Sequence, residues 1–224
     1  MKLAIFDIDG TLVDSRAMIT ASLTAAFATE RLAVPAQERL LSIVGLSLVD
    51  AMRVLAPGEE AQRHEQLAAA YKAAFWKYRE DNAHAETLFA GALEILKNLR
   101  AQEDVVLGIA TGKSRRGVAH LLEKHGFDGW FATIQTSDTN PSKPHPSMVT
   151  EALAETGVEP RGAIVIGDTS FDIEMAREAG VGAIGVSWGN HPRTELERAG
   201  AHHIVNDFNE LEARLEVLWE DRAE

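Results

Sequence analysis

Short apolar runs alternate with helical periods over the second half of the chain. Strands are predicted where an uninterrupted apolar run is bounded by turn residues, and helices where apolar positions recur with helical spacing. The predicted strands are 2–6, 105–110, 131–135, 163–166, 182–186 and 203–205, and the predicted helices are 114–125, 146–156, 171–179 and 211–219. Buried strands that alternate with helices favour a parallel sheet. The predicted fold class is therefore α/β, with a Rossmann-like parallel sheet core and helices on both faces.

The segment between the first two predicted strands has a different pattern. It contains long helical periods at 18–32 and 59–79 and no convincing strand. A crossover between parallel strands normally needs one helix, whereas this segment has room for about four. Ordinary crossover helices packed on the sheet are an alternative, but an inserted all-helical cap domain is favoured. The predicted division is residues 1–14 and 84–224 for the α/β core and residues 15–83 for the helical cap.

Composition and charge narrow the classes of function. The 224 residues are 46% hydrophobic and 25% charged, which is ordinary for a globular protein. The net charge of −12 argues against a nucleic-acid or anionic-membrane surface, because such surfaces need clustered Lys and Arg. The absence of cysteine excludes disulfides, thiolate catalysis and Cys-ligated zinc. Asp7 interrupts the first apolar run too early for a signal peptide, and no window approaches a membrane span, so we expect a soluble cytoplasmic protein.

Two acidic residues follow the first predicted strand. Asp7 and Asp9 are two positions apart, so their side chains point to the same side. Two carboxylates held together repel each other unless a cation or a shared proton compensates. Asp9-Gly10 is also a common turn dipeptide, and a plain turn is an equally good interpretation of this fragment alone.

Three later strand ends carry further polar residues, and in a parallel sheet all of them share an edge with Asp7. They are Thr111-Gly112-Lys113-Ser114, Ser142-Lys143-Pro144 and Gly167-Asp168-Thr169-Ser170-Phe171-Asp172. Each has a structural alternative, because Thr111 and Asp168 are typical helix caps and Lys143 stands among turn residues like a solvated surface lysine. The first segment is not a P-loop, since that motif needs four residues between its glycines.

Together and in this order, these segments resemble the haloacid dehalogenase-like hydrolase superfamily. The helical segment after the first strand is similar to the cap of the branch that contains phosphoglycolate phosphatases and β-phosphoglucomutases. The resemblance implies a phosphoric monoester hydrolase that cleaves a small phosphomonoester, phosphoglycolate-like or a sugar phosphate, through an aspartyl-phosphate on Asp7. It also implies Mg²⁺ as cofactor and a small phosphorylated substrate as partner, with no nucleic acid and no membrane, in a monomer or homodimer.

The resemblance further implies roles for five residues at the sheet edge. Asp7 would be the nucleophile and Asp9 the acid/base that protonates the leaving alcohol and then takes a proton from water. Thr111 and the amide of Gly112 would hold phosphate oxygens. Lys143 would neutralise the charge shared by Asp7 and the phosphoryl group.

A metal site completes what the resemblance implies. Asp168 would bind Mg²⁺ together with Asp7 and the backbone carbonyl of Asp9, and Asp172 would support the site from behind. The charge balance points the same way, since each unpaired like-charge contact at ~4 Å costs on the order of 4 kcal/mol at an effective dielectric of 20. Lys143 alone does not offset four carboxylates and a phosphate, whereas a divalent cation with oxygen ligands does.

Two positions bear on the alternatives within the superfamily. Asp9 favours phosphoryl transfer, because the dehalogenases differ at this position. In the turn Val44-Gly45-Leu46-Ser47-Leu48, Leu48 stands where phosphonate-cleaving relatives carry a Schiff-base lysine and phosphoglucomutase relatives tend to carry arginine. A phosphomutase of the same fold and a non-hydrolytic phosphoacceptor or binding protein stay open. Three other residues of the helical segment are expected to be solvated rather than in contact with substrate: Arg53, His64 and His84.

Overall fold

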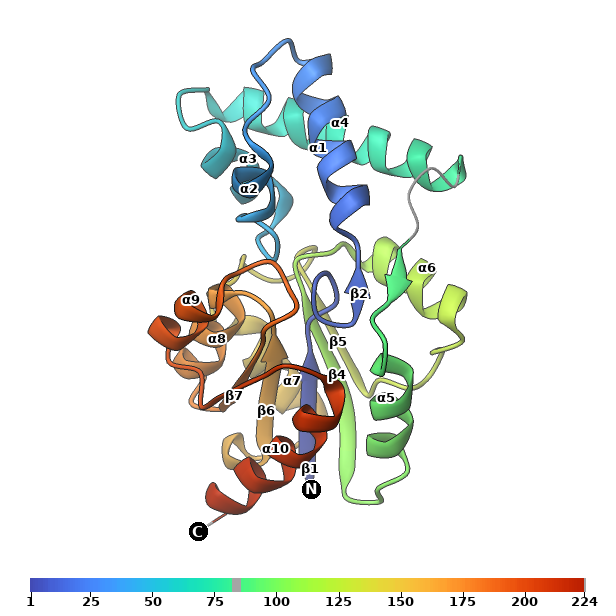
Figure 1. Ribbon diagram of the computed structural model, residues 1–224, viewed down its shortest axis with the longest axis vertical. Helices are drawn as coiled ribbons and strands as arrows, with labels where there is room; N and C mark the ends of the chain where they lie inside the picture. The colour runs from blue at the N-terminus through green and yellow to red at the C-terminus, as the bar shows by residue number, and fades with distance from the viewer. Residues whose placement is uncertain (82–85, 224) are drawn as a thin grey trace.

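A parallel sheet forms the centre of the molecule in a computed structural model that describes residues 1–81 and 86–223 (Figure 1). Its strands in the described chain are β1 (Lys2–Phe6), β4 (Val105–Thr111), β5 (Thr133–Thr136), β6 (Ala163–Gly167), β7 (Gly182–Val186) and β8 (His203–Val205). They lie in the order β5-β4-β1-β6-β7-β8, and every neighbouring pair is parallel. The predicted α/β fold class is thereby confirmed.

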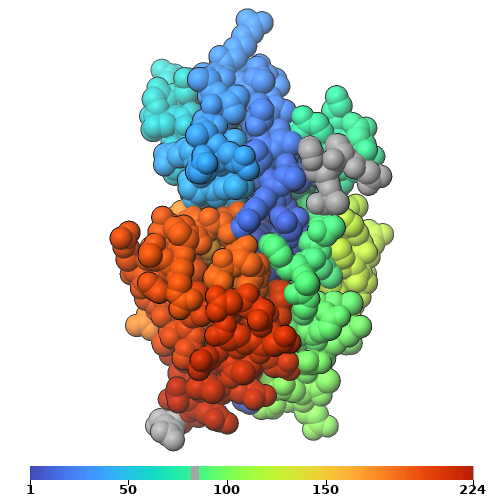
Figure 2. Space-filling view, in the orientation of Figure 1, coloured from blue at the N-terminus to red at the C-terminus, as the bar shows by residue number. Residues whose placement is uncertain are grey.

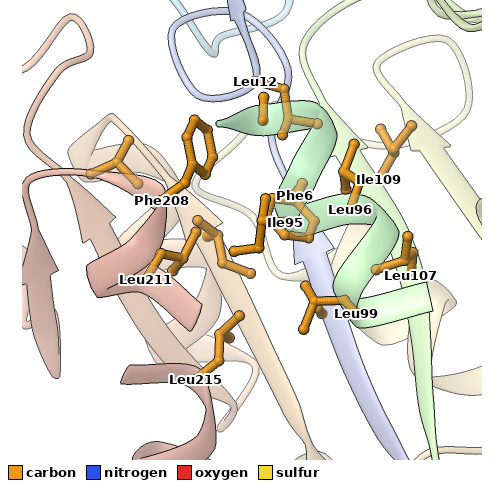
Figure 3. Packing of buried hydrophobic residues seen from close by; sticks show 14 of the residues in the cluster. Phe6, Leu12, Ile95, Leu96, Leu99, Leu107, Ile109, Phe208, Leu211 and Leu215 are labelled. Atoms are coloured by element: carbon orange, nitrogen blue, oxygen red, sulfur yellow. The ribbon is translucent and has the colours of Figure 1, made fainter. Parts of the chain in front are cut away.

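Helices cover both faces of this sheet, and alternate residues of β1 point into the two cores so formed. The helices are α5 (Ala92–Arg100), α6 (Arg115–His125), α7 (Ser147–Thr156), α8 (Ser170–Glu178), α9 (Arg193–Ala199) and α10 (Phe208–Asp221), with a 3-10 turn η1 at Pro160–Gly162. Ala4 and Phe6 pack with α5, α6 and α10, and Figure 3 shows the α5 and α10 side chains in this core. Leu3 and Ile5 pack with α7, α8 and α9. Burial on both faces is the reason why β1 reads as a continuous apolar run.

The chain between β1 and α5 forms a helical lobe beyond the carboxyl ends of the strands (Figure 1). Its elements are β2 (Val13–Asp14), α1 (Arg16–Thr29), α2 (Gln37–Leu41), α3 (Leu48–Leu55), α4 (Ala61–Glu80) and β3 (Thr87–Leu88). The lobe has a hydrophobic cluster of its own, in which Leu23, Phe27, Met52 and Leu67 are buried. Figure 2 shows the lobe seated on the wider α/β part of the molecule.

Two features of the lobe concern its limits. β2 and β3 pair antiparallel where the chain leaves and re-enters the α/β part, a ribbon that the sequence pattern did not predict. The predicted boundary between residues 83 and 84 lies outside the described residues, so this division into domains stays a prediction.

Over the residues that the structure describes, no helix is long and apolar enough to cross a membrane.

The alternative interpretation of Thr111 and Asp168 as helix caps is wrong. Thr111 still belongs to β4, where it pairs with Thr136, and the cap of α6 is Ser114, whose hydroxyl accepts from the amide of Gly117 at 3.2 Å. Likewise Thr169, not Asp168, caps α8. β4 includes Thr111 and β6 ends directly before Asp168, so the capping position falls three residues after Thr111 and one residue after Asp168.

Candidate functional site

The register of three strands brings the predicted acidic and hydroxyl side chains to one edge. Phe6 pairs with Ile109 of β4 on one side and with Ile166 of β6 on the other. The amide of the next residue, Asp7, donates to the carbonyl oxygen of Ile166 at 2.9 Å. Because all three strands run in the same direction, Asp7 lies beside the ends of β4 and β6, which carry Thr111 and Asp168.

Lys143 is the cation at the centre of this edge. Its Nζ donates to Oδ1 of Asp7 at 2.8 Å and to Oδ1 of Asp172 at 2.6 Å. The Lys143 side chain is 0% exposed, so the interpretation of this residue as a surface lysine is wrong. Burial alone would lower the pKa of Lys143, but the carboxylates of Asp172 and Asp7 raise it above its usual value. Lys143 is therefore a permanent positive charge between two acids.

Asp7 has one engaged oxygen and one unengaged oxygen. Its Oδ2 is buried and has no hydrogen-bond partner among the described residues, although its Oδ1 accepts from Lys143. Burial raises the pKa of the Asp7 carboxyl to about 7, Lys143 opposes that rise, and Asp172 and Asp168 add to it. An unpartnered buried oxygen is costly and is unusual in a folded protein. At this position it is available to an electrophile or a cation.

Asp168 is held by donors on both oxygens. Its Oδ1 accepts from the Thr11 hydroxyl at 2.9 Å, and its Oδ2 accepts from the amide and the Nδ2 of Asn190 at 2.7 and 2.9 Å. Burial raises the pKa of Asp168 to about 6, while these hydrogen bonds oppose the rise. A Cβ at Gly10 or Gly189 would overlap the Asp168 side chain, so glycine is what lets both loops approach it.

The acidic residues of this edge fit a hard divalent cation. Asp7, Asp168 and Asp172 each offer a carboxylate oxygen, and these atoms lie within 4.8 Å of one another. Oxygen donors of this kind suit Mg²⁺ better than softer metals. Three buried carboxylates face the single charge of Lys143, and the unpartnered Asp7 oxygen lacks a positive neighbour of its own. Both oxygens of Asp172 are already engaged by Lys143 and Thr169, which leaves Asp172 less free than Asp7.

Asp9 lies in a second group of charges that reaches into the helical lobe. The Nζ of Lys113 donates to both Asp9 carboxylate oxygens, at 2.8 and 2.9 Å, and lies 3.3 Å from Oε1 of Glu86. Arg79 of α4 donates to Oε2 of Glu86 through its Nε, at 3.0 Å, and through its Nη2. Burial would lower the pKa of Lys113, but Asp9 and Glu86 raise it. Burial would raise the pKa of Glu86, but Lys113 and Arg79 lower it.

Four charged or amide residues of the site were not assigned to it from the sequence. Lys113 and Asn190 follow the parallel strands β4 and β7, so the rule that located Asp168 could have located them as well. Glu86 and Arg79 carry no comparable signal. They belong to the returning segment and to α4, whose position over the sheet depends on how the lobe packs.

The lobe covers the sheet edge at Thr111 and Gly112. Both residues line a cavity of about 270 Å³ that Asp7 and Asp9 also line. Thr111 is buried, and a Cβ on Gly112 would lie 2.6 Å from the carbonyl oxygen of Gly45 in the α2–α3 turn. The turn therefore packs directly on the backbone that follows β4, and its residues line part of the cavity.

Three residues of the lobe are predicted to be solvated, and each prediction has a different outcome. His64 is buried, and its Nε2 lies 2.8 Å from the carbonyl oxygen of Ala56, so that prediction is wrong. The packing of α4 against the end of α3 encloses the ring. Arg53 is exposed and pairs with Asp50 at 2.5 Å, as expected of a surface residue. His84 lies outside the described residues.

Known proteins are similar to this chain over most of its length. The family model described as haloacid dehalogenase-like hydrolase matches residues 4–186. The probable phosphatase IndB of Dickeya dadantii is 34% identical over 214 residues, which cover 93% of this chain and 91% of that protein. A phosphoglycolate phosphatase of Agrobacterium fabrum is 32% identical over 217 residues, covering 93% and 90%. A solved hydrolase structure from Pseudomonas syringae has a TM-score of 0.85 at 27% identity, covering 96% of this chain and 98% of that one.

Proposed function

Because this chain belongs to the haloacid dehalogenase-like hydrolase family, we propose that it is a Mg²⁺-dependent phosphatase of a small phosphomonoester. The observation that carries the proposal is the state of Asp7. One oxygen of this buried carboxylate is held by Lys143, the other has no partner, and the residue lines the cavity beneath the helical lobe. A carboxylate nucleophile needs such a free oxygen and a nearby cation that reduces its repulsion from an anionic phosphate.

The proposed reaction has two displacements at phosphorus. In the first, an Asp7 oxygen bonds to phosphorus, the bond from phosphorus to the alcohol oxygen breaks, and Asp9 gives its proton to that oxygen. In the second, water attacks the phosphorus of the aspartyl-phosphate, Asp9 takes the proton of the water, and Asp7 is released together with inorganic phosphate. Both oxygens of Asp9 are held by Lys113, so Asp9 exchanges one of these contacts when it reaches the leaving oxygen.

The residues around Asp7 supply the phosphate site. Thr111 and the amide of Gly112 would hold phosphate oxygens, since both residues line the cavity beside Asp7. Lys143 would balance the negative charge that Asp7 and the phosphoryl group share. Its pairing with Asp172 keeps the Lys143 ammonium in place when Asp7 changes from a free carboxylate to an acyl phosphate.

The metal site of the proposal uses Asp7, Asp168 and the backbone carbonyl of Asp9, with Asp172 behind them. When bound, Mg²⁺ supplies positive charge that screens the phosphate from the carboxylates. Thr11 and Asn190 orient Asp168 through hydrogen bonds to both of its oxygens. Holding a ligand in this way limits its rotation before the metal binds.

The helical lobe, predicted as residues 15–83, would act as a cap. Its turn at Gly45 packs on Gly112, so it encloses the site that Asp7 lines. Such a cover excludes bulk water until the alcohol has left, and it must move to admit substrate and release product.

Phosphate release tests the proposal. Wild-type protein, Asp7→Asn and the control Asp128→Asn, which changes an exposed carboxylate, are assayed on a panel of phosphomonoesters with Mg²⁺ or with EDTA. We expect release only with Mg²⁺, and only from the wild type and the control. Release by Asp7→Asn at the wild-type rate would contradict the proposal. Isomerisation of a sugar phosphate without release would indicate a phosphomutase, and stable phosphorylation of Asp7 would indicate a phosphoacceptor.

A further inference from the structure

One arginine of the helical lobe holds the loop that follows β7. Arg16 is the first residue of α1, and its Nη2 donates to the carbonyl oxygen of Trp188 at 2.7 Å and to that of Gly189. The Nε of the same guanidinium donates to Oδ1 of Asn190 at 3.3 Å. Arg16 therefore contacts three consecutive residues of the α/β part, which lie 172 to 174 positions away in the chain.

The same loop orients Asp168, one of the proposed metal ligands. The backbone amide of Asn190 donates to Oδ2 of Asp168 at 2.7 Å, and its Nδ2 donates to the same oxygen at 2.9 Å. The side-chain amide of Asn190 thus accepts from Arg16 and donates to Asp168. The reverse orientation would place its NH2 group against the guanidinium and its oxygen against the carboxylate, so the two neighbours fix this amide.

The two oxygens of Asp168 differ in what holds them. Oδ1 accepts from the Thr11 hydroxyl, and the carbonyl oxygen of Thr11 accepts from the Nε1 of Trp188 at 3.1 Å. The Trp188 ring lies 4.7 Å from the ring of Phe208 on α10, so this side is anchored in the α/β part. Oδ2 depends on Asn190, whose side chain is held by α1 of the lobe. A displacement of α1 therefore acts on Oδ2.

Helix α1 is an integral part of the lobe. Phe27 of α1 and Leu67 of α4 are buried in the same hydrophobic cluster, and Arg16 stands at the end of α1 that faces the α/β part (Figure 1). A displacement of the lobe must therefore break the hydrogen bonds of Arg16 or carry the loop after β7 with it. Either event changes how Asn190 holds Asp168.

We propose that Arg16 is a positioning residue that couples the closed position of the lobe to metal binding at Asp168. When the lobe is seated on the sheet edge, Arg16 fixes Asn190 and Asn190 fixes the Asp168 carboxylate, so the ligand loses less freedom when a cation binds. Coupling of this kind is reciprocal, so the closed lobe is favoured by the same factor when the cation is bound. The proposal rests on the proposed phosphatase function, because it concerns the Mg²⁺ site of that function.

The affinity for Mg²⁺ tests the coupling without turnover. It is measured from the rise of the unfolding temperature with Mg²⁺ concentration, with each variant compared with itself in EDTA. We expect Arg16→Gln to raise the Kd for Mg²⁺ ~5-fold or more. Loss of a positive charge beside the site would by itself tighten the binding of a cation, so a weaker affinity has to come from lost positioning.

Arg63→Gln is the matched control. Arg63 is also partly buried, and it donates to the carboxylate of Glu30 at 2.8 Å and to the carbonyl oxygen of Glu30 at 2.6 Å. These contacts lie within the lobe. We therefore expect Arg63→Gln to lower the unfolding temperature in EDTA and to keep the wild-type Kd for Mg²⁺.

A double-mutant cycle separates positioning through Asn190 from a general loss of structure. Asn190→Ala removes the side-chain amide between Arg16 and Asp168 and keeps the backbone donor. We expect Asn190→Ala to raise the Kd for Mg²⁺ ~10-fold, as for other residues that orient a metal ligand. In that background, Arg16→Gln should add no further change. Effects of the two substitutions that multiply would overturn the assigned route through Asn190.

Hydrogen exchange tests the reciprocal effect on the lobe. The backbone amide of Ser47, in the α2–α3 turn, donates to the hydroxyl of Ser142 at 2.8 Å, a contact between the lobe and the α/β part. We expect saturating Mg²⁺ to slow exchange of this amide ~5-fold in the wild type and in Arg63→Gln, and less in Arg16→Gln. Exchange that does not respond to Mg²⁺ in the wild type would contradict the coupling.

The outcomes separate this proposal from the proposed phosphatase. Asp168→Asn is the reference in which one metal ligand is altered. If Mg²⁺ raised the unfolding temperature of Asp168→Asn as much as that of the wild type, the metal site would be contradicted, and the coupling with it. If binding depended on Asp168 but Arg16→Gln kept the wild-type Kd, the coupling would be overturned while the metal site was supported.

Discussion

Asp7→Asn is expected to stabilise the metal-free protein at neutral and alkaline pH. The pKa of the Asp7 carboxyl is about 7 in the folded protein, against 3.8 for an ordinary aspartate. The folded state therefore binds the proton more tightly than the unfolded chain does. The stabilisation that comes from the protonated carboxyl is complete below about pH 4 and is lost as the pH rises through about 7. Above that pH the protein keeps an ionised carboxylate that burial disfavours.

The magnitude follows from the two pKa values. Each pKa unit corresponds to 1.36 kcal/mol, so the raised pKa of Asp7 lowers the free energy of unfolding, relative to a fully protonated carboxyl, by ~4 kcal/mol at pH 8 and by ~2 kcal/mol at pH 5. Asparagine approximates the protonated carboxyl, because it is neutral and its carbonyl can still accept from Lys143. We therefore expect Asp7→Asn to raise the free energy of unfolding by ~4 kcal/mol at pH 8 and by about half as much at pH 5.

Urea denaturation in EDTA, followed by tryptophan fluorescence, measures this difference. Asp128→Asn is the control, because its exposed side chain should change the free energy of unfolding little at either pH. Lower stability of Asp7→Asn at pH 8 would refute the reasoning. So would a gain in stability that does not shrink between pH 8 and pH 5, since the gain would then come from something other than the buried charge.

Three further changes probe the metal site, the charged group around Asp9 and Lys113, and the cap. At pH 8, Mg²⁺ at 100 times its Kd should raise the free energy of unfolding of the wild type by ~2.7 kcal/mol and that of Asp7→Asn much less. If Mg²⁺ raised the unfolding temperature of both proteins equally, a metal site at Asp7 would be contradicted. Lys113→Met should lower kcat ~10-fold or more and change KM less, because Asp9 loses the group that holds both of its oxygens. An unchanged kcat would contradict the role of Lys113 in positioning Asp9. Gly112→Ala should raise KM, because the new Cβ would lie 2.6 Å from the Gly45 carbonyl oxygen. Gly58→Ala is the control: its new Cβ would have no atom within 4 Å, so steady-state kinetics should be unchanged.

The sequence by itself determined the sheet and the residues at its edge. β1, β4 and β6 are buried on both faces, and this burial leaves a continuous apolar run that can be read without any tertiary information. Because parallel strands end at a common edge, the position of Asp7, Thr111 and Asp168 after such runs was enough to bring them together. Lys143 was different, since its local sequence is typical of a surface turn and only the resemblance to a family suggested its role.

Only the tertiary structure decided which charges pair and what the cavity is made of. Lys113 pairs with Asp9 across 104 positions of the chain, and nothing in the local sequence of a lysine specifies a partner so distant. Similarly, the apolar residues of α3 and α4 follow the same helical spacing whether they pack into a core or face a ligand. Leu67 is in the core of the lobe and Phe75 lines the cavity, although both lie on α4. Periodicity specifies the buried face of a helix, whereas the packing of the whole chain determines what that face meets.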